Sequence, residues 1–464
     1  MTRSGIAVRV LVAAALNERP RSTLVIMADR ISELRLTAFK SFRDVALPLS
    51  PLAVLIGRNG GGKSNALDAL EVLSRLAKGT EIRDALDGMS RDAGPVRGGV
   101  EGCPPYGSET FELGITVRQA SGGDIRLDVR IQARPQVQVL WERLVGNVAG
   151  RRRMLLETLA PDPHRADIEV KLWNGKQGRN PHRMFRASHL VTAQLPLRLE
   201  SRTEAERCIL QTATTALGVL GGVFHLDPVP HLMRHYVPEQ DVVLRRTGEN
   251  LSAAVARLRH DEPTKFTELV DVIKDLPEHE IRAIEIRQGG FGEVMLGLSE
   301  VNDGALTTVS ARQMSDGMLR MTAIATALLT GSQGLAIDSA AADSQPLTLV
   351  LEELENGLHP TQAARVLNLL KASAAQQSYQ VVLTTHSPAL LNALNGNDHP
   401  EVVLIRRDQN TGRSRATRLV DLPNYYAMMA SGGLGDAVAA GRLLDPDRPS
   451  RIDSLELDKL LGIA

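Results

Sequence analysis

The residues best suited to chemistry lie in one stretch, Gly57 to Ser64, which reads Gly-Arg-Asn-Gly-Gly-Gly-Lys-Ser. It matches G-x-x-x-x-G-K-[ST], the pattern of a phosphate-binding loop. Its glycines would let backbone N–H groups approach phosphate oxygens, Lys63 would neutralise the β- and γ-phosphates, and the Ser64 hydroxyl would hold Mg²⁺. The predicted nucleotide contacts are Gly57, Arg58, Asn59, Gly60, Gly61, Gly62, Lys63, Ser64 and Asn65.

The sequence around this loop supports the match. Pro51 to Ile56 is an apolar run typical of a buried strand, and Ser64 to Lys78 is typical of a helix closed by Gly79. The N-terminus of that helix would add partial positive charge beside the phosphates. The order strand, glycine-rich loop, helix therefore favours a phosphate site over an incidental glycine-rich turn.

Two apolar strands in the last third of the chain end in side chains that could serve phosphate chemistry. The strand at 347–351 is followed by Glu352, which could reach Mg²⁺, and Glu353, which could polarise an attacking water. The strand at 380–384 leads to His386, which could hydrogen-bond a γ-phosphate. Taken singly, an acidic surface turn and an ordinary histidine are the better explanations.

Ser315, Asp316 and Gly317 stand before an apolar helix at 318–330. A Ser and a Gly ahead of a helix N-terminus can form an anion-binding nest, although a plain N-cap by Ser315 or Asp316 is the simpler alternative. A tight turn, Asn356 to Pro360, follows the paired glutamates.

The order of these segments is more specific than any one of them. The chain contains, in this order, the phosphate loop, a long intervening region, the Ser-x-Gly before a helix, the strand followed by Glu-Glu, the Asn-Gly turn and the strand followed by His. In this order the chain resembles the ATP-binding-cassette (ABC) ATPases of the RecF/SMC type. It resembles more closely the stand-alone AAA family ATPases related to the ATPase half of OLD-family nucleases. The resemblance covers roughly residues 29–425 and is strongest at 39–76 and 312–388.

The resemblance assigns family roles to the matching positions. They are Gly57–Ser64 for Walker A, Leu347–Glu353 for Walker B, Met314–Met318 for the signature, Asn356–Pro360 for the D-loop and His386 for the switch histidine. The turn Phe39–Phe42 resembles one that lies beside the nucleotide in this family, which adds Lys40 and Ser41 to the predicted nucleotide contacts.

The resemblance also implies a mechanism that needs two chains. Two chains would sandwich two ATP molecules, so that Walker A of one chain faces Ser315, Asp316 and Gly317 of the other. The catalytic residues would be Glu353, which activates water, His386, which holds the γ-phosphate, and Lys63. Ser64 and Glu352 would bind Mg²⁺. Hydrolysis would then open the dimer.

Three positions depart from the family pattern or cannot be matched to it. Asp316 stands where transporter cassettes have Gly, although Ser-Asp-Gly is familiar in this branch. Glu352 stands where Asp is usual, so its contact with Mg²⁺ would be longer or bridged by water. The Q-loop has no clear match, and Gln194 is only a candidate.

Composition narrows the class of protein. The 464 residues include 54 basic and 54 acidic side chains, and a net charge of zero argues against constant, tight, non-specific binding to nucleic acid. Aromatic residues make up only 3%, too few for extensive stacking on single strands. Cys103 and Cys208 lack partners at metal-binding spacing, so we expect incidental or buried thiols in a reducing cytoplasm. No apolar run approaches the ~20 residues of a membrane span.

The predicted fold is α/β: an ABC-type P-loop head with a mixed sheet, and a β-rich and helical lobe inserted between Walker A and the signature. The predicted parts are 1–28, a disordered extension or a mis-assigned start upstream of Met27; 29–120, the N-terminal part of the ATPase lobe; 121–305, the inserted lobe; and 306–464, the C-terminal part. The β pattern runs from Thr110 to about Trp173. The most basic stretches, 151–153 and 176–186, predict either a surface for nucleic acid or a partner, or solvated loops.

The leading functional hypothesis is an ATP-driven switch or clamp that acts in DNA maintenance or antiviral defence with a separate effector protein. A self-contained OLD-type nuclease would need a TOPRIM domain with a Glu and an Asp-x-Asp cluster after the ATPase, whereas residues 421–464 are typical of a short helical tail, which disfavours it. A transporter cassette is disfavoured by the β-rich lobe and by the Ser-Asp-Gly signature. A nucleotide-dependent scaffold with little hydrolysis stays open.

Overall fold

The computed structural model describes residues 28–88, 94–162, 165–176, 178–274, 280–337, 346–375, 379–430 and 432–443. The predictions for residues 1–27, including Met27 as a natural start, lie outside the described residues.

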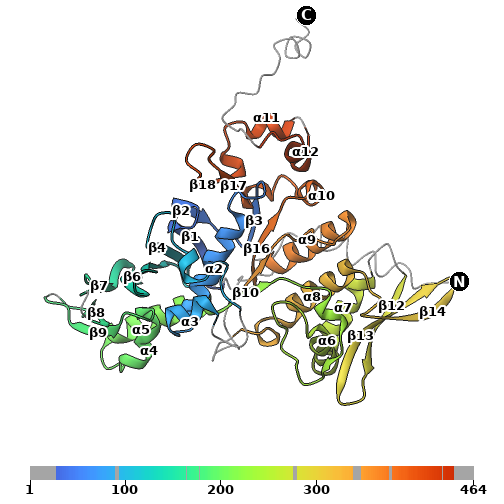
Figure 1. Ribbon diagram of the computed structural model, residues 1–464, viewed down its shortest axis with the longest axis horizontal. Helices are drawn as coiled ribbons and strands as arrows, with labels where there is room; N and C mark the ends of the chain where they lie inside the picture. Colours follow the sequence, from blue (N-terminus) through green and yellow to red (C-terminus); the bar gives the residue numbers. More distant parts are fainter. Residues whose placement is uncertain are drawn as a thin grey trace, which may run out of the picture.

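One mixed sheet of 14 strands runs through the described molecule, in the order β10-β15-β16-β3-β17-β18-β2-β1-β4-β5-β6-β7-β8-β9 (Figure 1). Its strands are β1 (Arg30–Phe39), β2 (Phe42–Pro48), β3 (Leu52–Ile56), β4 (Thr110–Arg118), β5 (Asp124–Gln132), β6 (Gln138–Val148), β7 (Arg151–Thr158), β8 (Asp167–Leu172), β9 (His182–Arg186), β10 (Val223–Leu226), β15 (Leu347–Leu351), β16 (Tyr379–Thr385), β17 (Val402–Arg407) and β18 (Ser414–Arg418).

The strands β10, β15, β16, β3 and β17 pair in parallel and form the centre of the fold. Every residue of β3 and of β15 is buried, as expected for strands with both faces covered. Ala53 and Leu55 pack with α2 (Lys63–Ala77) on one face. Val54 and Ile56 pack with α8 (Asp316–Thr330) and α9 (Pro360–Ala375) on the other. The carboxyl ends of these strands therefore meet at one edge, where ligands bind in such sheets.

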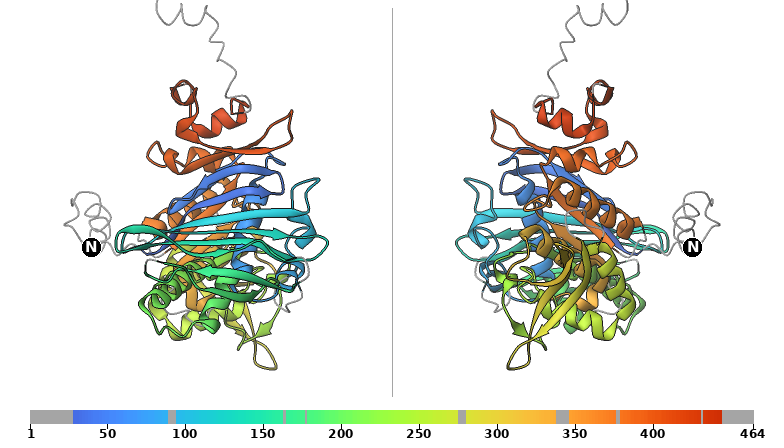
Figure 2. Two further views of the ribbon diagram at one scale, coloured as in Figure 1. Left: turned by 90° about the vertical axis from the view of Figure 1, so that its left-hand side faces the viewer. Right: turned by 90° about the vertical axis from the view of Figure 1, so that its right-hand side faces the viewer.

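The strands β1 and β4 to β9 extend the same sheet as an antiparallel meander. The helices α4 (Val191–Arg198) and α5 (Glu204–Gly221) lie along one side of it (Figure 2). Inward residues such as Phe111, Leu113 and Ile115 are fully buried. The predicted boundary at 120/121 falls in the turn between β4 and β5, which pair over their whole length. The β-rich part is thus joined to the ATPase sheet by continuous backbone pairing.

The remaining elements form a second lobe and a C-terminal cap (Figure 1). A smaller sheet contains β11 (Val237–Pro238), β12 (Ile281–Gln288), β13 (Glu293–Asn302) and β14 (Ala305–Ser310), and it packs with α6 (Leu251–Asp261) and α7 (Pro263–Lys274). The short helices are α3 (Ile82–Asp87), α10 (Pro388–Asn392), α11 (Tyr425–Ala430), α12 (Leu434–Ala439) and the 3-10 turns η1 (Val100–Gly102), η2 (Leu232–Arg234), η3 (Ser332–Gly334), η4 (His399–Glu401) and η5 (Leu419–Asp421).

The sequence predicted most of the sheet and missed several shorter elements. The strand before the P-loop and the helix after it, the 110–173 meander and the strands followed by Glu352 and His386 are confirmed. The composition of 79–109, rich in Gly, Pro and Asp, predicts a loop, but this stretch contains α3. Neither β9 nor β10 was predicted, because four or five residues give too little periodicity.

Candidate functional site

The P-loop lies directly on two neighbouring strands. Gly57 has φ 144°, and a Cβ there would overlap the carbonyl oxygen of Ile405 on β17. A Cβ on Gly61 would lie 2.9 Å from the same oxygen. Gly62 has φ 116°, and a Cβ there would overlap the hydroxyl of Ser414 on β18. Glycine is therefore required at these positions by the loop's own packing as well as by phosphate binding.

Ser414 joins the P-loop to the turn at 39–42. Its buried hydroxyl donates to the Gly61 carbonyl at 2.7 Å and lies 2.7 Å from the Ser41 hydroxyl. The Asn65 amide donates to Ser41 Oγ at 2.8 Å. The structure thus brings Ser41 and Asn65 to the P-loop, as predicted, and both are hydrogen-bonded within the protein. Sequence reasoning missed Ser414, because nothing in its local sequence marks a contact 353 residues away.

The Lys63 ammonium is buried within the loop. Its Nζ donates to the carbonyl oxygens of Gly57 at 2.7 Å and Arg58 at 3.2 Å. Burial lowers the pKa of Lys63, and three carboxylates that follow β15 oppose that shift. Those carboxylates belong to Glu353, Glu355 and Glu352. The fold therefore brings the acidic turn after Walker B next to the Walker A lysine.

The two predicted Mg²⁺ ligands are in direct contact. Ser64 Oγ donates a hydrogen bond to Glu352 Oε1. A hydroxyl and a carboxylate are hard oxygen donors, and Mg²⁺ is usually held by one or two such groups together with substrate phosphates and water. The described residues contain no group of three or more His, Cys, Asp or Glu side chains that could hold a metal by themselves. The pair fits Mg²⁺ that arrives with a nucleotide.

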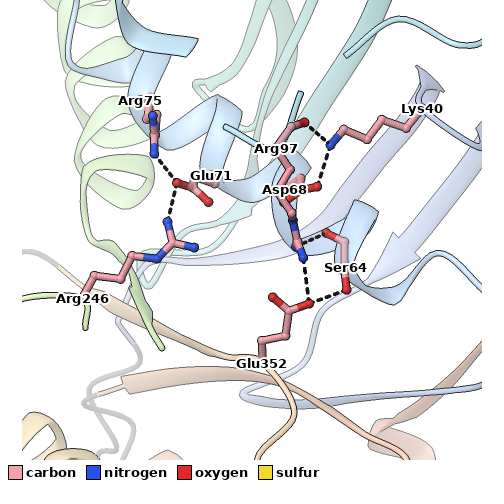
Figure 3. Close-up of polar contacts among 8 residues, drawn as sticks. All are labelled: Lys40, Ser64, Asp68, Glu71, Arg75, Arg97, Arg246 and Glu352. Atoms are coloured by element: carbon pink, nitrogen blue, oxygen red, sulfur yellow. Dashed lines mark hydrogen bonds and ion pairs between the residues drawn. The ribbon is translucent and has the colours of Figure 1, made fainter. Parts of the chain in front are cut away.

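An arginine that sequence reasoning did not select completes this corner of the site (Figure 3). Arg97 donates to Glu352 Oε1 at 3.1 Å, to the Ser64 carbonyl at 3.1 Å and to Asp68 Oδ1 at 2.8 Å. Lys40 donates to Asp68 Oδ2 at 2.7 Å. Burial alone would lower the pKa of Arg97, but Asp68 and Glu352 outweigh it and raise that pKa. The predicted contact residue Lys40 is thus committed to Asp68 on α2.

A second ionic cluster lies further along the same helix (Figure 3). Glu71 is ion-paired with Arg75 one turn on and with Arg246, whose Nη1 donates at 2.7 Å from the segment before α6. Burial would raise the pKa of Glu71, but His225, Arg246 and Arg75 together lower it to about 2. The spacing of these residues along α2 predicts one narrow polar stripe with an i,i+4 ion pair between Glu71 and Arg75, and that pair is present. The stripe itself is mostly buried, with Asp68 only 3% exposed.

Glu353 is held in an unusual backbone conformation. Its φ is 49°, which is uncommon for a residue with a side chain, and its N–H donates to Thr384 Oγ1 on β16 at 2.9 Å. The Asn356 amide of the D-loop donates to the Glu353 carboxylate at 2.6 Å. Thr384 thus holds the backbone of Glu353, and Asn356 holds its carboxylate, at the edge of the sheet where β15 and β16 end.

His386 follows β16 and pairs with Glu355. Its Nδ1 lies 2.9 Å from Glu355 Oε1, and its backbone N–H donates to the same oxygen at 2.6 Å. The other oxygen, Glu355 Oε2, is buried with no hydrogen-bond partner among the described residues. Sequence reasoning did not select Glu355, which would also fit the alternative of an acidic surface turn. The spacing Glu-Glu-Leu-Glu was the available signal, since it returns a carboxylate toward the same edge.

The signature residues begin α8. Ser315 is the N-cap, and its Oγ accepts from the Met318 N–H at 3.2 Å. A Cβ on Gly317 would lie 2.5 Å from the Gly357 carbonyl oxygen, so the D-loop packs directly on this turn. Asp316 is ion-paired at 2.7 Å with Arg234, which sequence reasoning did not select. The predicted N-cap by Ser315 is therefore confirmed, and anion binding at this helix end stays a prediction.

The other predicted residues lie either at the tip of the P-loop or away from it. Arg58, Asn59 and Gly60 form the exposed tip of the P-loop. The Gln194 side chain is hydrogen-bonded to backbone groups at Arg186, His189 and Leu190, at the end of α2 away from the P-loop. The structure thus places the Q-loop candidate outside the phosphate site.

Two parts of the chain match models of ATPase families. Residues 30–109 match one described as "AAA ATPase domain", and residues 223–392 match one described as "AAA domain, putative AbiEii toxin, Type IV TA system". The first covers the P-loop and α2, and the second covers the signature, Walker B and His386. The chain carries an AAA-type ATPase domain. The recognition of an ATPase of the AAA/ABC class is therefore confirmed, and the mixed sheet confirms the predicted α/β fold class.

Several solved structures resemble this ATPase domain and its attached lobes. One is titled "Crystal structure of the SmcHead bound to the C-winged helix domain of ScpA" (15% identity, 84% of this chain and 97% of that chain, TM-score 0.45). Another is the SMC head domain from Thermotoga maritima (14% identity, 84% and 98%, TM-score 0.39). A third is RecF with ATP (11% identity, 86% and 100%, TM-score 0.35). A comparison with curated proteins finds no match.

The helices in the described part of the chain do not meet the requirements for crossing a membrane. None of its helices combines the length and the apolar character needed to cross a bilayer.

Proposed function

We propose that this ATPase domain binds ATP with Mg²⁺, dimerises through the bound nucleotide and hydrolyses it as a molecular switch or clamp. The observation that supports this best is the gathering of five groups at one sheet edge. These groups are Lys63, Ser64, Glu352, Glu353 and His386, from segments up to 323 residues apart in the sequence.

Each of these residues has a role that its contacts support. Lys63 and the P-loop N–H groups would bind the β- and γ-phosphates, and burial keeps the Lys63 ammonium aimed into the loop. Ser64 and Glu352 would hold Mg²⁺. When bound, Mg²⁺ would neutralise charge on the phosphate oxygens.

Glu353 is the proposed general base. Asn356 donates a hydrogen bond to its carboxylate, and Thr384 holds its backbone, so both parts of the residue have a contact at the site. It would accept a proton from the attacking water. His386, supported by Glu355, would donate a hydrogen bond to the γ-phosphate and so report its loss.

The second half of the site would come from another copy of the chain. Ser315 and Gly317 lie at the start of α8, where Ser315 Oγ and the N-terminal N–H groups could meet an anion. Their contacts within the chain are with Met318, Gly357 and Gln362. A homodimer would present this helix end to the partner's P-loop.

The setting we propose is antiviral defence with a separate effector protein, with DNA maintenance as the alternative. The printed description of the family model at 223–392 includes a toxin of a type IV toxin–antitoxin system, and this supports the defence setting. Arg151, Arg152 and Arg153 are exposed on β7, and Arg179 and Arg186 are exposed near β9. DNA binding there would weaken with salt and with charge reversal of 176–186.

Mixing two defective variants would test the two-chain site. Lys63→Ala removes the phosphate lysine and keeps the signature, whereas Ser315→Arg obstructs the signature and keeps the P-loop. Each alone should lose ATP hydrolysis and ATP-dependent association, measured by phosphate release and light scattering. In a mixed dimer one site is intact, so an equimolar mixture should recover up to about a quarter of the wild-type rate.

Three results would contradict the proposal. Full activity of Ser315→Arg alone, or no recovery on mixing two folded variants that still form mixed dimers, would exclude a shared site. ATP-dependent association of the wild type without phosphate release would favour a scaffold with little hydrolysis.

A further inference from the structure

Asp316 sets an electrostatic problem for the proposed two-chain site. Its side chain is 62% exposed in the first turn of α8, next to Ser315 and Gly317, where the proposed function brings the partner's triphosphate. A carboxylate beside a triphosphate is a like-charge contact, which costs several kcal/mol at an interface when nothing compensates it. The described structure contains a compensating group at this point.

Arg234 contacts the signature from a separate segment. Its Nη2 donates to Asp316 Oδ1 at 2.7 Å and to the Met314 carbonyl at 2.8 Å. Its side chain is 24% exposed, and Nη1 is buried with no hydrogen-bond partner among the described residues. One arginine therefore holds both the carboxylate and the backbone just before the Ser315 N-cap, and it has a donor left over.

The position of Arg234 is fixed by its own turn. It closes η2, in which the N–H of Met233 donates to the Pro230 carbonyl at 3.1 Å, and Met233 is 1% exposed. Gly248 approaches Met233 closely from the other side. The Nη2 group carries two N–H donors, and it serves the Met314 carbonyl and the Asp316 carboxylate at once. Arg234 is thus held in place before any nucleotide arrives.

We propose that Arg234 is the positioning residue that makes the Ser-Asp-Gly signature compatible with the triphosphate bound by a second chain. It neutralises Asp316 and fixes the loop before Ser315, so that the start of α8 presents N–H and hydroxyl donors without a net negative charge. The ligand it serves is the γ-phosphate end of a nucleoside triphosphate on the partner. This inference rests on the proposed two-chain function.

A double-mutant cycle would test it. Arg234→Gln should weaken ATP-dependent dimerisation about tenfold in the wild-type background, because an uncompensated Asp316 is left facing the partner's phosphates. In the background of Asp316→Asn the same substitution should change dimerisation less than about twofold, because no charge is left to compensate. Arg234→Lys should keep part of the function, since it retains the charge and loses the fork. Arg245→Gln is the matched control, an ion-paired arginine in the same segment whose partners are Asp241 and Glu249.

The outcomes separate this inference from the proposed function. If wild type dimerises with ATP and Ser315→Arg does not, but Arg234→Gln dimerises as wild type, the inference is wrong and the two-chain site stands. If the loss in Arg234→Gln is equal in both backgrounds, Arg234 only supports the fold, and a matching fall in Tm without nucleotide would show it. If wild type never associates with ATP, the proposed function itself fails.

Discussion

The two halves of the proposed site are built in opposite ways. Behind its exposed tip at 58–60, the P-loop is braced within its own chain by Ile405, by Ser414 and by the ionic contacts of α2. The signature turn is braced from below by Gly357 and from one side by Arg234, while Ser315 and Asp316 are exposed. The P-loop half is thus assembled within one chain, whereas the signature half is an exposed helix end.

This difference teaches which half the chain forms on its own. A P-loop that is braced within its own chain can bind a nucleotide in a single chain. The exposed signature at the start of α8 acts only when a second chain brings phosphates to it. Substitutions in the P-loop half should therefore affect ATP binding itself. Substitutions in the signature half should affect association and turnover and spare binding by a single chain.

The largest effect on ATP hydrolysis is expected from a substitution of Glu353, because both halves of the site act on that reaction. Glu353→Gln removes the proposed base while keeping size and hydrogen bonding, so phosphate release should fall about 10²- to 10³-fold and the ATP-bound dimer should accumulate. ATP affinity measured by titration should persist, which serves as the folding control. Turnover equal to wild type would refute the role of Glu353.

A pair of glycines tests the packing of the P-loop half. Gly62→Ala places a methyl group on the Ser414 hydroxyl, whereas Gly60→Ala meets nothing within 4 Å, and both positions have positive φ. Strain of about 1–2 kcal/mol is common to both, and overpacking adds about 1–3 kcal/mol at Gly62 alone. ATP affinity of the Gly62 variant should therefore be about tenfold weaker than that of the Gly60 variant. Equal losses would mean that Ser414 does not brace the loop.

The substitution Gly317→Ala tests the packing of the signature half in the same way. An added Cβ would lie 2.5 Å from the Gly357 carbonyl and 2.8 Å from Gln362 Oε1, so Gly317→Ala should push the D-loop off α8. We expect ATP-dependent association to weaken about three- to tenfold, in line with an overpacking strain of about 1 kcal/mol. Binding of ATP by the dissociated chain should stay at the wild-type level. A loss of that binding would break the division between the two halves.

The smallest effect on ATP binding and association is expected from a carboxylate outside the site, in the sheet extension. Glu142 is fully buried and accepts the N–H groups of Val191 and Thr192 at the start of α4. Burial outweighs these hydrogen bonds and raises its pKa from 4.5 to about 7. The folded protein thus keeps a proton that the unfolded chain has lost, so the free energy of unfolding falls as pH rises from 4.5 to about 7.

Thermal unfolding of Glu142→Gln at pH 5 to 8 should lack that decline, a difference of about 1–3 kcal/mol between the ends of the range. ATP affinity and association should be the same in both proteins at each pH, because Glu142 contacts neither half of the site. Parallel pH profiles of stability would show that Glu142 does not titrate in this range.

The sequence identified the P-loop half well because its information is local. The glycine pattern at 57–62 and the apolar runs of β3, β15 and β16 each lie within a few residues, and the order of motifs placed Glu352, Glu353 and His386 on one edge. The predicted residues of both halves occupy the expected strands and helix ends. Their roles with ATP stay predictions.

The bracing residues could not be predicted, because each contact joins distant segments. Arg97 follows a Gly- and Pro-rich stretch with no period, Ser414 opens a short strand, and Arg234 ends a 3-10 turn. The burial of Asp68 and Glu71 could not be predicted for a related reason. Their spacing on α2 predicts only a polar stripe, and their buried charge is compensated by Lys40, Arg97 and Arg246 from distant segments.

A Cβ at Gly57 would overlap the carbonyl of Ile405, and this limits which residues of the P-loop evolution can replace. That carbonyl belongs to the backbone of β17, which no substitution of a side chain can remove. A descendant that had lost all use for nucleotide would therefore still be selected for glycine at this position, simply to fold. The side-chain contacts that Lys63 and Ser64 make within the chain can be lost by substitution without a backbone clash. In relatives of this chain, the loss of Lys63 and Ser64 beside a retained glycine would mark a domain that keeps the architecture and has abandoned the chemistry.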